Sequence, residues 1–168
     1  MGGRQKRGNR EASRAADRVS VKSRGGTDLT QVDFYQIESS ESTLVFACRL
    51  IEKVYRLKYK IHVHTASNDE AVMLDDLLWT FKPESFIPHE RYGSVLAAPI
   101  QICHQADPVL HQDVLINLSA SIPDFFSRFK RVAEIVPQEA ERRDSARESF
   151  RFYKERGYPL NYHKMGQR

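Results

Sequence analysis

Two histidines stand in a pattern that could begin a metal site. His62 and His64 are one residue apart in an apolar stretch. On a β-strand both imidazoles would therefore project from the same face. A bound metal needs further ligands, and no other His, Cys, Asp or Glu stands out at a suitable spacing. We favour packed or surface histidines and expect no metal and no other cofactor. A metal-dependent enzyme built on this pair is the less favoured alternative.

Other groups capable of catalysis do not form a recognisable set. Asp75 and Asp76 are adjacent in a helical pattern, so their carboxylates diverge by about 100°. Cys48 lies on the apolar face of a predicted helix, which favours a core position over a nucleophile. The sequence has no GxxxxGK[ST], GxGxxG or GxSxG motif, and the turn at 38–41 has two glutamates and no glycine. We therefore predict that the protein is not an enzyme.

Aromatic side chains are concentrated between residues 79 and 88. Trp79 and Phe86 lie there together with Pro83 and Ile87. Aromatic residues on a proline-stiffened segment suit a protein interface, because they offer a large contact area and lose little entropy on binding. The alternative is that Trp79 and Phe86 close over the protein's own core, and composition alone does not decide between the two.

Three arginines line one face of the last predicted helix. Arg143, Arg147 and Arg151 are spaced four residues apart, Phe150 lies beside them, and Val136 comes just before the helix. Guanidinium groups next to an apolar pocket suit an acidic peptide that ends in a free carboxylate after a Phe. The alternative is a solvated helix face whose arginines pair with neighbouring acidic residues.

Hydrophobic periodicity predicts strands and helices in alternation. The predicted strands are 32–37, 60–64, 95–104, 113–118 and 131–136. The predicted helices are 39–58, 67–80, 123–129 and 137–156. Ser67 and Glu70 form a capping box, and Gly157 is the expected C-terminal cap of the last helix. This order predicts a three-layer α/β fold, Rossmann-like without a nucleotide-binding loop, in which helices flank a mostly parallel five-stranded sheet. We predict a loop at 81–93 and a short tail at 158–168.

The charge is unevenly distributed along the 168 residues. The formal net charge is +4, but residues 1–30 hold eight Lys and Arg against three acidic residues, so residues 31–168 sum to −1. The basic, Gly- and Ser-containing segment 1–30 is predicted to be a disordered extension before one domain at 31–168. A direct nucleic-acid-binding function would therefore rest on this arm, and it is the alternative function.

Cysteine content and hydropathy bear on the cellular setting. The two cysteines lie outside any CxxC motif, which excludes a disulfide framework and a zinc-finger-like site. Free thiols suit a reducing compartment, so we expect a cytoplasmic protein. No run approaches 18 apolar residues, so we expect no membrane association.

From Val32 to about Lys164 the sequence resembles the chi subunit of bacterial DNA polymerase III, a clamp-loader accessory subunit. The resemblance covers roughly 130 residues and leaves out the N-terminal 30. The sequences that carry it are VDFY at 32–35, LDDLLW at 74–79, PESFIPH at 83–89, DVLINL at 113–118, EIVP at 134–137, and ARE at 146–148 followed by RFY at 151–153.

The resemblance implies a non-catalytic adaptor in DNA replication. The family's aromatic loop forms a heterodimer with the psi subunit, which implies that role for Trp79, Phe86, Pro83 and Ile87. Its second site binds the acidic C-terminal tail of single-stranded DNA-binding protein (SSB), which implies that role for Arg147, Arg143, Val136, Phe150 and Arg151. DNA would be reached only indirectly, through SSB. The family commonly has Lys at the first and last arginine positions and Tyr where Phe150 stands, so any hydrogen bond made by that phenol is lost here.

Overall fold

The computed structural model describes residues 29–82, 84, 86–91, 98–104 and 111–166. The predicted extension at 1–30 lies almost wholly outside these residues. Along the described part, the elements are β1 (Gln31–Ile37), α2 (Thr43–Arg56), β2 (Ile61–His64), α3 (Asn68–Thr80), β3 (His89–Arg91), β4 (Ile100–Cys103), β5 (Val114–Asn117), the 3-10 helix η1 (Phe126–Arg128), β6 (Arg131–Val136), α4 (Ala140–Glu155) and β7 (Leu160–Met165).

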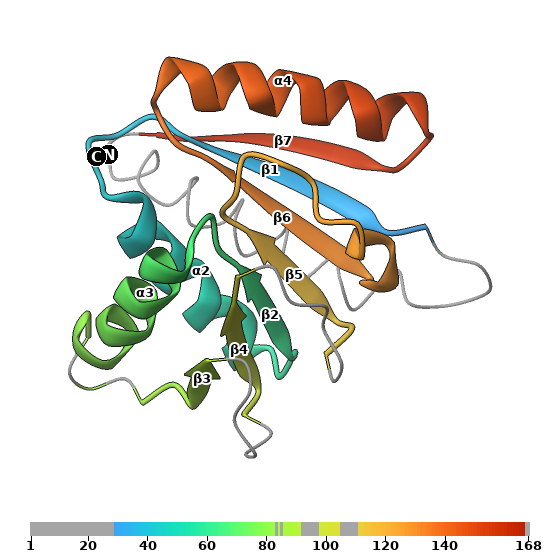
Figure 1. Cartoon of the computed structure of the whole chain (residues 1–168). Helices are drawn as coiled ribbons and strands as arrows, with labels where there is room; N and C mark the ends of the chain where they lie inside the picture. The colour runs from blue at the N-terminus through green and yellow to red at the C-terminus, as the bar shows by residue number, and fades with distance from the viewer. Residues whose placement is uncertain (1–28, 83, 85, 92–97, 105–110, 167–168) are drawn as a thin grey trace, which may run out of the picture.

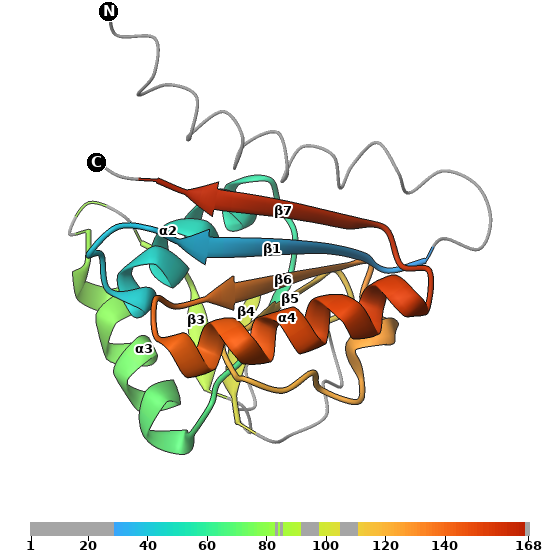
Figure 2. The same cartoon turned by 90° about the horizontal axis from the view of Figure 1, so that it is seen from above.

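The strands form one sheet in the order β3-β4-β2-β5-β6-β1-β7, and every neighbouring pair is parallel. Helices α2 and α3 cover one face, and α4 covers the other over β6, β1 and β7 (Figures 1 and 2). The predicted three-layer α/β fold with a parallel sheet is therefore confirmed. The sheet has seven strands in the described residues, where the sequence predicted five.

The two additional strands lie at the edges of the sheet. β3 falls within the stretch predicted as a loop, and β7 falls within the predicted tail. β3 has only three residues, all polar, and β7 alternates between half-buried and exposed positions. Such edge strands are defined mainly by their backbone pairing with β4 and β1, which a hydrophobic pattern does not reveal.

Three other predicted boundaries are also corrected. α2 begins at Thr43 rather than at residue 39, because no residue before Leu44 contributes to its apolar face. The predicted strand 95–104 is a strand only at Ile100–Cys103 in its described part. The predicted helix at 123–129 is reduced to the single 3-10 turn η1.

The sheet has a separate hydrophobic core on each face. On β1, Tyr35 and Ile37 face α2 and α3, whereas Val32 and Phe34 face α4. The inward-facing apolar residues of α2 and α3 lie in the first core, with Leu44, Tyr55 and Leu77 at its partly buried margin. The second core packs α4 through Ala146 and Tyr153 against the sheet. The parallel sheet is thus covered on both faces, as parallel sheets require.

The ends of the helices are fixed by local hydrogen bonds. The Ser67 hydroxyl accepts the amide of Glu70 at 3.0 Å, and the Glu70 carboxylate accepts the amide of Ala66 at 2.9 Å. This confirms the capping box, with the second bond one residue earlier than usual. At the end of α4, Gly157 has a φ of +81°, and the amides of Gly157 and Tyr158 donate to the carbonyls of Lys154 and Tyr153. This Schellman arrangement turns the chain back into β7.

A buried polar network ties α4 to the sheet. The Tyr153 hydroxyl on α4 donates to Glu134 on β6 at 2.7 Å, and the Asn117 amide on β5 donates to the same carboxyl group at 2.9 Å. Burial raises the pKa of Glu134 from 4.5 to about 7, against the opposing effect of these hydrogen bonds. The network fixes the helix that carries the three arginines.

Candidate functional site

The three arginines of α4 differ in how strongly the protein itself holds them. Arg143 is half-buried, and its Nη2 donates to the carbonyl oxygen of Ile37 at 3.1 Å and lies 3.9 Å from Glu38 Oε1. Arg147 has a side chain that is 76% exposed and forms an ion pair with Asp144 at 2.8 Å. Arg151 is also exposed. Arg143 is thus anchored at the end of β1, whereas Arg147 projects into solvent and can exchange its partner.

Phe150 and Val136 contribute to the second core, beneath the arginines. Val136 is buried, and Phe150 is half-buried with its ring centroid 5.5 Å from that of Phe34. The side chain of Val136 is therefore part of the support of the site, and Phe150 offers part of its ring to solvent.

Tyr162 on β7 is a member of this site that the sequence analysis missed. It is 42% exposed, stacks on Phe34 at 5.7 Å and meets Phe150 edge-on at 6.0 Å. Its hydroxyl donates to Gln36 Oε1. Burial raises the pKa of Tyr162, while the nearby charges of Arg143 and Arg147 lower it. In the sequence, the only sign of this role was an aromatic residue within the predicted tail. Because β7 was not predicted, nothing placed Tyr162 beside Phe34 and Phe150.

Together these residues form the arginine site, which comprises Arg143, Arg147, Arg151, Phe150, Val136 and Tyr162. It has cationic groups above the rings of Phe150 and Tyr162, with apolar support below. An arrangement of this kind can bind a carboxylate through charge-assisted hydrogen bonds while an apolar side chain packs on the rings. The alternative interpretation was a solvated helix whose arginines pair with acidic residues nearby on the same helix. Within the described residues, one such pair is formed, between Arg147 and Asp144.

The second set of predicted residues lies at the opposite edge of the sheet. Trp79, at the end of α3, is 50% exposed, and Phe86 is 71% exposed, with their ring centroids 5.7 Å apart. These two rings form the aromatic surface. Their exposure argues against the alternative that they close over the core. Ile87 is 2% exposed and packs inside the first core, so it supports this surface without forming part of it. Pro83 lies outside the described residues.

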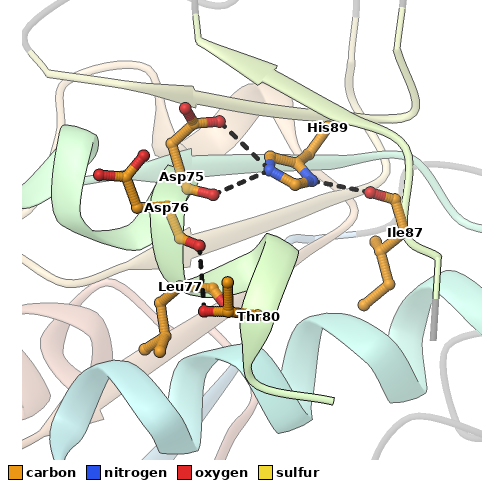
Figure 3. A network of polar contacts seen from close by, with 6 residues as sticks. All are labelled: Asp75, Asp76, Leu77, Thr80, Ile87 and His89. Atoms are coloured by element: carbon orange, nitrogen blue, oxygen red, sulfur yellow. Dashed lines mark hydrogen bonds and ion pairs between the residues drawn. The ribbon is translucent and has the colours of Figure 1, made fainter. Parts of the chain in front are cut away.

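His89 on β3 joins Ile87, in the segment before β3, to Asp75 on α3 (Figure 3). Its Nδ1 lies 2.7 Å from the carbonyl oxygen of Ile87. Its Nε2 lies 3.0 Å from the carbonyl oxygen of Asp75 and 3.2 Å from the carboxylate Oδ1 of Asp75. The imidazole ring is 4.3 Å from the ring of Trp79, centroid to centroid. The segment that carries Phe86 is thereby tied to the helix that carries Trp79.

The predicted His62–His64 pair is packed inside the protein. His62 Nε2 lies 3.0 Å from Cys103 Sγ, and the His62 ring packs against Phe125 and Phe129. Burial, with smaller effects from His64 and His111, lowers the pKa of His62 to about 3. Within the described residues, no three His, Cys, Asp or Glu side chains are grouped so that they could hold a metal ion.

Cys48 is buried in the first core, as the sequence predicted. Burial raises the pKa of its thiol to about 12, so the group is a poor nucleophile. Of the helices in the described part of the chain, none is both long and apolar enough to cross a membrane.

Comparison with known proteins identifies the family. The sequence model of the family described as "DNA polymerase III chi subunit, HolC" matches residues 29–161. The chain belongs to the DNA polymerase III chi subunit family. The matched region runs from the residues just before β1 into β7. It therefore includes the aromatic surface and every residue of the arginine site except Tyr162.

Three chi-family relatives are similar over most of this chain. The DNA polymerase III subunit chi of Pseudomonas aeruginosa is 42% identical over 139 residues, which cover 82% of this chain and 98% of that protein. The Escherichia coli K12 protein of the same name is 31% identical, over 68% of this chain and 80% of the relative. The Haemophilus influenzae protein is 30% identical, over 71% and 85%. Membership places this chi-family chain among the accessory subunits of a replicative polymerase.

The fold is also found outside the chi family. A solved structure, "Mss116p DEAD-box helicase domain 2 bound to an RNA duplex", matches with a TM-score of 0.56 and 10% sequence identity. The match covers 81% of this chain and 65% of that one. At this identity the likeness concerns the α/β architecture alone.

Proposed function

We propose that this chi-family chain is a non-catalytic adaptor that links the psi subunit of the clamp loader to the C-terminal tail of SSB. The observation that carries the proposal is the presence of two chemically different surfaces at opposite edges of one sheet. The arginine site lies on α4, β7 and the end of β6, and the aromatic surface lies between α3 and β3 (Figure 1). One molecule can therefore hold an acidic partner and an apolar partner at the same time.

The arginine site suits the acidic tail of SSB, which in the family's interaction ends in Phe with a free carboxylate. Arg147 is the residue on which the proposal chiefly depends, because it is exposed and exchanges one weak surface partner for the ligand. Arg143, held by the carbonyl of Ile37, gives a second cation in a fixed position. The exposed parts of Phe150 and Tyr162 offer rings against which the terminal Phe can pack.

The aromatic surface suits the psi subunit. Trp79 and Phe86 present two neighbouring rings to solvent and are held from below by Ile87 and His89. Exposed aromatic pairs that are already ordered bind with little further loss of entropy. Binding at both surfaces would concentrate the clamp loader wherever many SSB molecules coat single-stranded DNA.

The test is fluorescence anisotropy of a labelled SSB C-terminal peptide with the wild-type protein and Arg147→Ala. We expect Arg147→Ala to weaken binding about 10- to 150-fold, the scale of a charge-assisted hydrogen bond worth about 1.5–3 kcal/mol. Wild-type affinity should fall as salt rises, because the contacts are ionic. Lys154→Ala is the matched control, since it removes one exposed positive charge from the last turn of the same helix.

Two results would contradict the proposal. Equal peptide affinity in wild type and Arg147→Ala would mean that the peptide does not bind at the arginine site. Binding of bare single-stranded DNA that disappears on deletion of residues 1–30, together with no binding of the peptide, would favour the alternative nucleic-acid-binding function.

A further inference from the structure

The hydrogen-bond partners of His89 restrict its protonation. Nδ1 faces the carbonyl oxygen of Ile87, and Nε2 faces both the carbonyl oxygen and the carboxylate of Asp75. Carbonyl and carboxylate oxygens only accept hydrogen bonds, and a neutral imidazole donates from only one of its nitrogens. The geometry in Figure 3 is therefore fully satisfied by an imidazolium that donates from both nitrogens.

Two neighbours of His89 stabilise a positive charge that burial by itself disfavours. The His89 side chain is 0% exposed, so water does not screen its ion pair with Asp75. The ring of Trp79 lies 4.3 Å away, within the range of a cation–π interaction. On β4 the register partner is the apolar Ile100. The neighbouring Glu90 points to the other face of β3, where its carboxylate accepts hydrogen bonds from β4 and the residues before it.

We infer that His89 is a positioning residue: as an imidazolium bonded to Asp75 and Ile87 at once, it holds the aromatic surface in place. A ring that donates from one nitrogen alone would leave the other nitrogen opposed to an acceptor. It would also place no cation below Trp79. The carbonyl of Ile87 follows Phe86 by one residue, so release of that hydrogen bond frees the segment that carries the second exposed ring.

The consequence for partner binding rests on the proposed function. If the aromatic surface binds psi, that binding should weaken in a variant that lacks the contact between His89 and the Asp75 carboxylate. The charge state of His89 and the order of the surface do not depend on psi, so they can be tested on the isolated full-length chain.

The chain contains a single tryptophan, so its emission reports on Trp79 alone. A protonated imidazole quenches indole fluorescence more strongly than a neutral one. Trp79 emission is compared between the wild type and two variants at one neutral pH. Nitrogen–proton correlation spectra of the histidine rings at neutral pH report which nitrogens carry protons. Asp75→Asn removes the carboxylate charge that faces His89, and Asp76→Asn is the matched control on the same helix, with its side chain exposed.

We expect both His89 nitrogens to carry protons in the wild type. In Asp75→Asn we expect one ring nitrogen to lack its proton and Trp79 emission to rise, because the opposite charge that faces the ring is lost. In Asp76→Asn the ring protons and the Trp79 emission should stay as in the wild type. A wild-type His89 ring with only one nitrogen protonated, or the same Trp79 emission in the two variants, would overturn the inference.

Discussion

The buried carboxyl group of Glu134 should make the stability of this protein depend on pH in an unusual direction. Its pKa is raised from 4.5 to about 7 in the folded protein, chiefly by burial. Between these two values the folded protein holds a proton that the unfolded chain has already released. Stability should therefore fall as pH rises through this window, opposite to the usual behaviour of a carboxylate in an ion pair.

The size of the effect follows from the change in pKa. A rise from 4.5 to about 7 corresponds to about 3 kcal/mol of unfolding free energy, present at low pH and lost above neutrality. The Tyr153 hydroxyl and the Asn117 amide partly offset the cost of burying the carboxylate, and their effect is already included in that value.

Glu134→Gln removes the titration and keeps the shape of the side chain. Urea unfolding at a series of pH values should show that, relative to wild type, Glu134→Gln gains about 3 kcal/mol between about pH 4.5 and pH 8. Glu148→Gln, on the exposed face of α4, serves as the matched control and should change little with pH. If the Glu134→Gln and wild-type curves ran parallel, the argument from burial would be refuted.

Three further variants test the proposed sites. Asp144→Asn should strengthen SSB-peptide binding several-fold, because Asp144 now competes for Arg147 at 2.8 Å. The anisotropy assay measures this, and an unchanged or weaker affinity would mean that Arg147 does not contact the peptide. Trp79→Ala should weaken psi binding, measured by calorimetry, while lowering the unfolding free energy only slightly. Ile87→Ala should instead lower the unfolding free energy strongly, by about 2–5 kcal/mol, because the Ile87 side chain lies in the first core. A large loss of stability in Trp79→Ala would contradict the assignment of that ring to an interface.

The sequence predicted most strongly those elements whose own side chains determine their structure. The apolar faces of α2 and α3 and the buried strands β2, β5 and β6 carry periodic patterns, and Ser67 and Gly157 mark helix ends through local hydrogen bonds and a positive φ. β3 and β7 were missed because pairing with a distant strand, rather than local sequence, makes them strands.

The same distinction applies to the sites. The spacing of Arg143 and Arg147 placed them on one face of a helix, and the exposure of Trp79 and Phe86 agrees with an interface. Sequence spacing could not show that Arg143 is held by the carbonyl of Ile37, because the two residues are 106 positions apart. It could not show that Tyr162 completes the arginine site either, because that contact depends on β7, which was not predicted. Nor could it separate Ile87, which is buried, from its exposed neighbour Phe86.

The claim that one molecule links two partners is tested most directly by measuring SSB-peptide affinity with and without saturating psi. The two surfaces lie at opposite edges of the sheet, so the peptide should bind with the same affinity to the free protein and to the psi complex. In that complex Arg147→Ala should still abolish most of the peptide binding. Competition between psi and the peptide, or the absence of a ternary complex, would contradict the adaptor proposal.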